Sequence, residues 1–187
     1  MQLLPMYILI VLTFCVLRFV QVHAGFAEDS LEMHNEYRAK HGCPALTLDQ
    51  ELSAGCESYA KILAEKGSLE HSKEKGFGEN LCYTSDDATS CVKMWYDEIS
   101  LYNYNKPGFS METGHFTALV WKASTKLGIG KETKSGVNYV VARYQPSPNV
   151  LGEFEQNVPR SNNGVFHSVS FGFVVVAAVW HLIELIA

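Results

Sequence analysis

The stretch that most constrains the fold of this chain is Gly114–Ser124, which reads GHFTALVWKAS. Phe116, Leu119 and Val120 recur at the i, i+3 and i+4 spacing of a short helix that buries one face. His115 stands at the head of that helix, so its imidazole should be held rigidly near the edge of a core. A histidine in this position is either a hydrogen-bonded structural residue or part of a functional site, and the segment taken alone favours the structural interpretation.

Three longer helices are predicted before this stretch, over Glu28–His41, Asp49–Lys66 and Asp86–Tyr102. Acidic residues open the first helix and basic residues close it, as the helix dipole prefers. The second helix carries a broad apolar stripe at helical spacing and should end at Gly67. The third helix has a similar stripe, and Ser85 or Asp86 is its candidate N-terminal cap.

Two strands are predicted after Gly114–Ser124, over Lys126–Glu132 and Asn138–Gln145. In each, alternate side chains are expected to face a core. Lys134–Gly136 between them is typical of a hairpin turn. Helices followed by a pair of strands, without an alternating strand–helix rhythm, indicate an α+β fold rather than a doubly wound sheet. With 187 residues, the chain has room for one domain of ordinary size.

The two ends of the chain are more apolar than its middle and divide it into three parts. Residues 1–24 are predicted to be a secretory signal peptide, and an uncleaved signal anchor is the alternative because no basic residue precedes the apolar run. Residues 25–158 are the predicted domain. Residues 159–187 combine a polar linker with a hydrophobic tail, in which Ser161–Gly164 offers the small residues of a glycosylphosphatidylinositol (GPI) anchor site. A membrane segment that is not cleaved and free secretion are the alternatives for this tail.

Cysteine usage agrees with an exported protein. Cys15 lies in the predicted signal peptide, which leaves an even number of cysteines in the rest of the chain. Four cysteines allow three pairings, and their spacings favour two local disulfides, Cys43–Cys56 and Cys82–Cys91. The formal net charge is −5 and there is no block of lysine and arginine, so nucleic acid is not an expected partner.

Several motifs resemble those of the CAP superfamily, which comprises cysteine-rich secretory proteins, insect venom antigens and plant pathogenesis-related proteins. They are GHFTALVW, His-Asn-x-x-Arg at 34–38, His-Ser at 71–72, Gly-Glu-Asn-Leu at 78–81 and Trp-Tyr-x-Glu at 95–98. The resemblance spans most of residues 30–150. It implies a three-layer α-β-α sandwich with a central, mostly antiparallel sheet. For Asn35 and Arg38 we expect a structural role, in which they pin the first helix to a neighbouring loop.

The resemblance also implies a site. His71, Glu79, Glu98 and His115 match the two histidines and two glutamates that converge in one cleft in this superfamily. Members of the family bind metal there, and the imidazoles of His71 and His115, with water completing the shell, can hold a divalent metal such as zinc. The carboxylates would then orient a bound water or ligand. A purely structural polar network of the same four residues is the alternative.

The end of the second strand departs from the secreted branch of the superfamily. Ala142, Arg143 and Pro148 stand where that branch carries cysteine, asparagine and glycine, and Val140–Tyr144 resembles instead the Golgi-associated plant pathogenesis-related branch. That branch binds membranes and anionic lipids peripherally, a property that a net charge of −5 does not favour here. The aromatic loop Tyr102–Phe109 is a further candidate for contact with a lipid or sterol, unless its rings pack over the end of the third helix.

Together these features predict an extracellular CAP-domain protein, secreted or held at the cell surface, that binds ligands rather than catalysing a reaction. Its cleft would hold a divalent metal and a lipid or sterol ligand. A metal-dependent hydrolase that uses the same cleft is the alternative, because a metal-activated water beside a glutamate is a workable mechanism. Against it, no serine or cysteine lies in a recognisable nucleophile motif.

Overall fold

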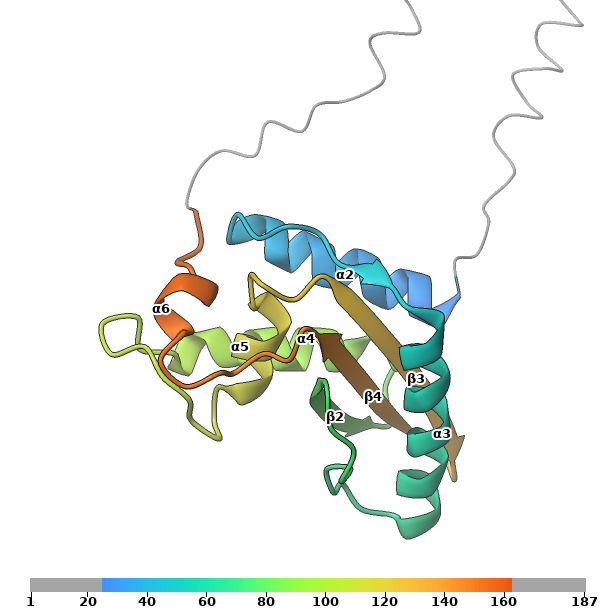
Figure 1. Ribbon diagram of the computed structural model, residues 1–187. Helices are drawn as coiled ribbons and strands as arrows, with labels where there is room; N and C mark the ends of the chain where they lie inside the picture. The colour runs from blue at the N-terminus through green and yellow to red at the C-terminus, as the bar shows by residue number, and fades with distance from the viewer. Residues whose placement is uncertain (1–24, 163–187) are drawn as a thin grey trace, which may run out of the picture.

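The computed structural model describes residues 25–162, in which one central sheet lies between helical layers (Figure 1). The elements in chain order are α2 (Phe26–Lys40), β1 (Thr47–Leu48), α3 (Gln50–Lys66), β2 (Gly78–Thr84), α4 (Ser90–Asp97), a 3-10 helix (Glu98–Leu101), α5 (Gly114–Val120), β3 (Lys126–Lys134), β4 (Val137–Gln145) and α6 (Phe154–Asn157).

The sheet contains four strands in the order β1-β3-β4-β2. β1 pairs in parallel with β3, whereas β3 with β4 and β4 with β2 are antiparallel, so the predicted mostly antiparallel sheet is confirmed. Ser135 and Gly136 join β3 to β4 with φ angles of 52° and 77°, as a tight hairpin turn requires. β2 is an addition to the prediction, since the sequence around Gly78 indicates only a glycine-rich turn that enters an apolar stretch.

Different helices cover the two faces of the sheet, which gives the predicted α-β-α sandwich (Figure 1). α3 packs against β3 and β4 on one face, and α2, α4 and α5 pack together on the other. Alternate residues of β4 serve the two layers. Val141 packs with Cys56 and Leu63 of α3, whereas Val140 and Tyr144 belong to the larger core on the opposite face.

Two glycines of β3 allow α3 to lie unusually close to the sheet. A Cβ atom at Gly128 would lie 2.3 Å from the Cβ of Leu52, and one at Gly130 would lie 2.3 Å from the backbone nitrogen of Glu57. The helix therefore rests on strand backbone at these two positions, where no side chain fits.

α2 is fixed to the loops beside it by two of its polar residues, as predicted. Asn35 exchanges two hydrogen bonds with the backbone of Leu46, donating to its carbonyl at 3.1 Å and accepting from its amide at 2.7 Å. Arg38 is completely buried, and within residues 25–162 its guanidinium donates only to backbone carbonyl groups. The acceptors are Pro44, Leu119, Trp121 and Ser124, at 2.8–2.9 Å.

α3 (Gln50–Lys66) agrees with its predicted bounds to within one residue and ends at the predicted glycine. The carboxylate of Asp49 accepts the backbone N–H of Leu52 at 3.0 Å and caps the helix. Gly67 ends it in the left-handed conformation, with φ at 69°.

α4 is shorter than predicted. It begins at Ser90 rather than at Asp86, because the side chain of Asp87 accepts hydrogen bonds from the backbone and hydroxyl of Thr89 and holds a turn there. Its final turn is a 3-10 helix over Glu98–Leu101. The predicted element is therefore a turn, an α-helix and a 3-10 helix in succession.

One predicted disulfide is confirmed and the other is wrong. Cys82 on β2 is bonded to Cys91 on α4. Cys43 and Cys56 are both free and buried. Cys56 lies on α3 against one face of the sheet, whereas Cys43 follows α2 on the other side, where its thiol donates to the carbonyl of Val120 at 3.1 Å. The sheet separates these two cysteines, although only a short stretch of sequence lies between them.

The predicted signal peptide, residues 1–24, lies outside the described residues, and so does most of the predicted hydrophobic tail, residues 163–187. The start of the polar linker returns to the end of α2, where the backbone N–H of Asn162 donates to the carbonyl of Lys40 at 2.7 Å. Among residues 25–162, no helix combines the length and apolar character needed to cross a membrane.

Candidate functional site

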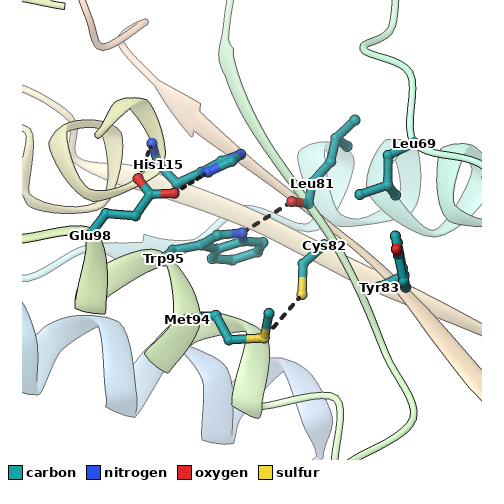
Figure 2. Close-up of a pocket in the computed structure, with 8 residues that line it drawn as sticks. All are labelled: Leu69, Leu81, Cys82, Tyr83, Met94, Trp95, Glu98 and His115. Atoms are coloured by element: carbon teal, nitrogen blue, oxygen red, sulfur yellow. Dashed lines mark hydrogen bonds and ion pairs between the residues drawn. The ribbon is translucent and has the colours of Figure 1, made fainter. Parts of the chain in front are cut away.

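The first half of the site is built where α5 begins. The backbone N–H groups of His115 and Phe116 both donate to Oε2 of Glu98, at 3.0 and 3.1 Å. The other carboxylate oxygen, Oε1, lies 2.6 Å from Nδ1 of His115 (Figure 2). Glu98 follows α4 directly, so one carboxylate holds both the start of α5 and the imidazole. Nε2 of His115 is left on the side of the ring away from Glu98.

Trp95 of α4 supports this pair (Figure 2). Its indole N–H donates to the carbonyl of Leu81 at 3.1 Å, which ties α4 to β2. Its ring centroid lies 6.3 Å from that of His115, with the two planes inclined by 27°. Because the Trp95 side chain is buried, the imidazole rests beside a fixed apolar surface.

The second half of the site lies on the segment of residues 67–77 between α3 and β2, which contains no helix or strand and is called the His71 loop below. Nδ1 of His71 lies 3.1 Å from Oε1 of Glu79 on β2. The same oxygen accepts the backbone N–H of Ser72 at 2.9 Å. This pair therefore repeats the arrangement of the first half, with a glutamate that binds both Nδ1 and a backbone amide.

Glu79 is a buried carboxylate that remains ionised. Burial raises its pKa, but hydrogen bonds from His71, Ser72 and Arg143 outweigh that effect and bring the pKa below its ordinary value. The bond from Arg143 runs from Nε to Oε2 of Glu79 at 3.1 Å. Both carboxylate oxygens of Glu79 are thus engaged.

Both histidines open onto one cavity of about 270 Å³. Three of the four predicted site residues, His71, Glu79 and His115, line it, whereas Glu98 acts on it through His115. Within residues 25–162, no hydrogen bond joins one histidine–glutamate pair to the other. The remaining walls of this histidine cavity come from Asn80, Phe109, Met111, Gly114 and Asn149.

Two asparagines that the sequence analysis did not select fix the position of α5, one from β2 and one from the segment after β4. Asn80 donates to the carbonyl of His115 at 3.0 Å, and Asn149 donates to the carbonyl of Gly114 at 3.0 Å. Asn80 belongs to the Gly-Glu-Asn-Leu motif, so a signal for it was present in the sequence. Asn149 has a φ of 61° and lies beyond β4, where no local pattern points to a contact with α5.

His115 also lines a second, apolar cavity of about 380 Å³ (Figure 2). Buried Trp95 and Leu81 form its floor, and the exposed side chains of Tyr83 and Met94 stand at its rim. The sequence analysis did not predict this apolar cavity, because its walls come from separate segments of the chain. The residues that line the apolar cavity are Leu69, Leu81, Cys82, Tyr83, Met94, Trp95, Glu98 and His115.

The rings of the aromatic loop are divided between the core and the surface. Tyr102 lies 5.6 Å from Phe116 and 4.8 Å from Tyr104 between ring centroids, so these rings pack into the fold. Phe109 is 49% exposed and lines the histidine cavity.

To a divalent metal, the cleft offers the imidazoles of His71 and His115. A histidine that binds metal commonly donates its second ring N–H to a carboxylate, and both histidines contact one here. No hydrogen bond to Nε2 of His71 or His115 forms within residues 25–162. The same part of the chain contains no group of three or more histidine, cysteine, aspartate or glutamate side chains placed to hold an ion. The protein would therefore supply two ligands, and water the others.

The family model of the cysteine-rich secretory protein family, CAP, matches residues 31–144 of the chain. Golgi-associated plant pathogenesis-related protein 1 of Homo sapiens is 46% identical over 141 residues, which cover 71% of this chain and 92% of the human protein. Secreted protein RBT4 of Candida albicans is 37% identical over 134 residues, covering 68% of this chain but only 36% of that longer protein.

Among solved structures, the crystal structure of NaASP2 with Zn²⁺ matches with a TM-score of 0.56 and 24% sequence identity, over 71% of this chain and 84% of that one. This likeness shows a shared fold. The region matched by the family model includes both histidine–glutamate pairs and the disulfide. The chain therefore belongs to the CAP family of cysteine-rich secretory proteins.

Proposed function

We propose that this protein is an exported binding module, not an enzyme, whose cleft holds a divalent metal such as zinc between His71 and His115. One observation carries the proposal: both histidines line one cavity, while each contacts a different glutamate through Nδ1. An imidazole held in this way presents Nε2 as the electron-pair donor to a metal. The presence of Zn²⁺ in the NaASP2 structure, which shares the fold, is consistent with such a site.

The apolar cavity beside His115 supports a lipid or sterol as the organic ligand. Its volume of about 380 Å³ is in the range of small-molecule sites, roughly 300–1,000 Å³. Trp95 gives it a rigid floor, and the exposed Tyr83 and Met94 at the rim lose contact with water when an apolar group covers them. A polar group of the same ligand would then reach the cleft at His115.

An extracellular location, either secreted or held at the cell surface, is the third part of the proposal. The Cys82–Cys91 disulfide supports an oxidising compartment. One relative is named as secreted and another as Golgi-associated, and both descriptions belong to the export route. The predicted signal peptide and GPI anchor remain predictions.

The hydrolase alternative is weakened by the glutamates. Glu98 accepts two backbone N–H groups besides contacting His115, and Glu79 accepts bonds from Ser72 and Arg143 besides contacting His71. A general base needs an oxygen free to receive a proton from water. Both carboxylates instead hold other groups in place, which suits a binding site.

Zinc titration of the full chain by isothermal calorimetry tests the metal site. We expect His71→Ala and His115→Ala each to weaken binding at least tenfold, since each removes one of two protein ligands. Lys73→Ala, at an exposed position on the same loop as His71, is the matched control and should bind like the wild type. Equal zinc binding by the wild type and the double histidine variant would contradict the proposal. Zinc-dependent hydrolysis of an ester or peptide that disappears in these variants would favour the hydrolase.

Binding of a fluorescent sterol or acyl probe tests the apolar cavity. Met94→Glu should weaken binding several-fold, because it places a charge at the rim of an apolar site. Leu151→Glu is the control, since Leu151 is 83% exposed and lines neither cavity. The same affinity in both variants would exclude the apolar cavity as the binding site.

A further inference from the structure

Arg143 is a buried cation behind the His71 half of the site. It stands on β4 directly opposite Glu79 in the register of β4 with β2. Its side chain is 2% exposed, and that of Glu79 is 6% exposed. The bond from Nε of Arg143 occupies Oε2 of Glu79 at 3.1 Å, which turns Oε1 toward Nδ1 of His71 and the amide of Ser72.

The same guanidinium also anchors the His71 loop. Its two terminal nitrogens donate to the two carboxylate oxygens of Glu74, at 3.2 and 3.3 Å, in a bidentate pair. Its central carbon lies 4.1 Å from the ring centroid of Phe77. Both residues belong to the loop that carries His71, so Arg143 fixes that loop and the glutamate beside it at once.

α3 is shaped to leave room for this arginine. A Cβ atom at Gly55 would lie 2.8 Å from a terminal nitrogen of Arg143. On the other side of the cleft, the contacts of His115 run to Glu98 and Asn80, and no hydrogen bond from Arg143 reaches them within residues 25–162. Arg143 is therefore placed to act on one histidine and not on the other.

We propose that Arg143 is a positioning residue for His71, which sets the orientation in which that histidine turns Nε2 into the cavity. Without it, Oε2 of Glu79 loses its hydrogen bond and the His71 loop loses its bidentate anchor. The claim about the orientation of His71 stands by itself, whereas the zinc measurement below rests on the proposed function.

The test compares Arg143→Met, which removes the guanidinium but keeps most of the length, with Arg143→Lys, which keeps the charge but cannot form the bidentate contact. Nitrogen-15 NMR of the metal-free full chain reports the tautomer of each histidine, and calorimetry reports zinc affinity. We expect Arg143→Met to weaken zinc binding about 10- to 100-fold, the usual effect of losing a partner behind a metal ligand. His71 should then populate both tautomers while His115 keeps one, and Arg143→Lys should recover part of the loss.

Three results would overturn the proposal. An unchanged His71 tautomer in Arg143→Met would remove its basis, and so would equal changes at His71 and His115, which indicate a general loss of structure. If the wild type binds zinc, an unchanged zinc affinity in Arg143→Met would do the same. If the wild type binds no zinc, the proposed function fails, but the tautomer of His71 still decides the role of Arg143.

Glu74→Gln keeps the test decisive if Arg143→Met does not fold. The Glu74 side chain is 61% exposed, and glutamine keeps one oxygen that can accept from the buried guanidinium, so the replacement removes the bidentate ion pair and disturbs the core less than Arg143→Met does. We expect a loss of order at His71 alone, smaller than in Arg143→Met. No change at either histidine would count against Arg143 as the anchor of the loop.

Discussion

His34 is a completely buried histidine that the fold keeps neutral. Nδ1 donates to the carbonyl of Ser30 at 2.7 Å, which leaves Nε2 to accept from the hydroxyl of Tyr144 at 2.9 Å. Burial lowers the pKa of His34 from 6.5 to about 4; the bond to Ser30 opposes this shift and the charge of Arg38 adds to it. The side chain is thus a structural element of the core, on the same helix as Asn35.

The depressed pKa of His34 predicts a loss of stability in acid. Between pH 6.5 and about 4, the imidazole of His34 binds a proton in the unfolded state but stays neutral in the folded state. The free energy of unfolding therefore falls as the pH drops through this window. The full loss is about 3 kcal/mol near pH 4, and there is none above the unfolded pKa. Urea unfolding at several pH values should show a shallower acid slope for His34→Gln than for the wild type. Parallel slopes would contradict this assignment, since His41, whose pKa burial also lowers, is present in both proteins.

Single residues were predictable where a local motif names them. The motifs selected both histidine–glutamate pairs and the two pins of α2, and the structure places Asn35 and Arg38 as expected. Arg143 was noted only as a departure from the family, because its partner Glu79 is set by the register of β4 with β2. Sequence spacing carries no information about such a pairing when one of the strands is not predicted.

At the scale of elements, α4 links the disulfide to the histidine cleft. Cys91 in its first turn is bonded to β2, the indole of Trp95 is tied to Leu81, and Glu98 at its end holds His115. The helix is short, so these fixed points determine its position more than its intrinsic stability does.

Removal of the disulfide should therefore destabilise this junction. The bond closes a loop with a sequence separation of 9, and its loss in Cys82→Ser/Cys91→Ser should cost about 2–3 kcal/mol of unfolding free energy. Urea unfolding of the wild type with and without a thiol reductant provides the comparison, and the reductant should have no effect on the double variant. A variant as stable as the oxidised wild type would mean that Trp95 and the core hold α4 without the bond.

Elements whose apolar residues recur at a regular spacing were predictable from the sequence, and elements without such a spacing were not. α3 and the β3–β4 hairpin fall within a few residues of their predicted bounds, because apolar spacing and turn residues mark both. β2 has no regular alternation, since buried residues follow one another along Leu81–Cys82 where both faces are covered. The wrong Cys43–Cys56 pairing has a similar cause, because spacing along the chain does not reveal on which side of a sheet each cysteine lies.

At the scale of the whole molecule, the contact of α3 with β3 joins two of the three layers. The two glycines of β3 set the distance between helix and sheet, because the backbone of α3 occupies the space of the missing side chains. The smaller core of Cys56, Ala60, Leu63, Leu81 and Val141 is formed between these layers.

A methyl group at this contact should push the layers apart. In Gly130→Ala the new Cβ would lie 2.3 Å from the backbone nitrogen of Glu57, which cannot move independently of α3. We expect a loss of about 2–3 kcal/mol in the free energy of unfolding, at the upper end of overpacking effects. Gly108→Ala is the control, since nothing lies within 4 Å of its added Cβ, and its change should stay below about 0.5 kcal/mol. Similar denaturation midpoints for the two variants would show that this contact does not set the distance between α3 and the sheet.

The two halves of the cleft differ in how freely evolution or design can alter them. Glu98 holds the imidazole of His115 and also accepts hydrogen bonds from backbone N–H groups at the start of α5. A substitution of Glu98 therefore alters that helix together with the site. His71 sits on a loop whose ends are fixed by α3 and β2 and whose interior is largely exposed. New ligand preferences are therefore most readily obtained by substitutions within residues 67–77 that keep His71, Ser72, Glu74 and Phe77, with the α4–α5 junction retained as the invariant half of the receptor.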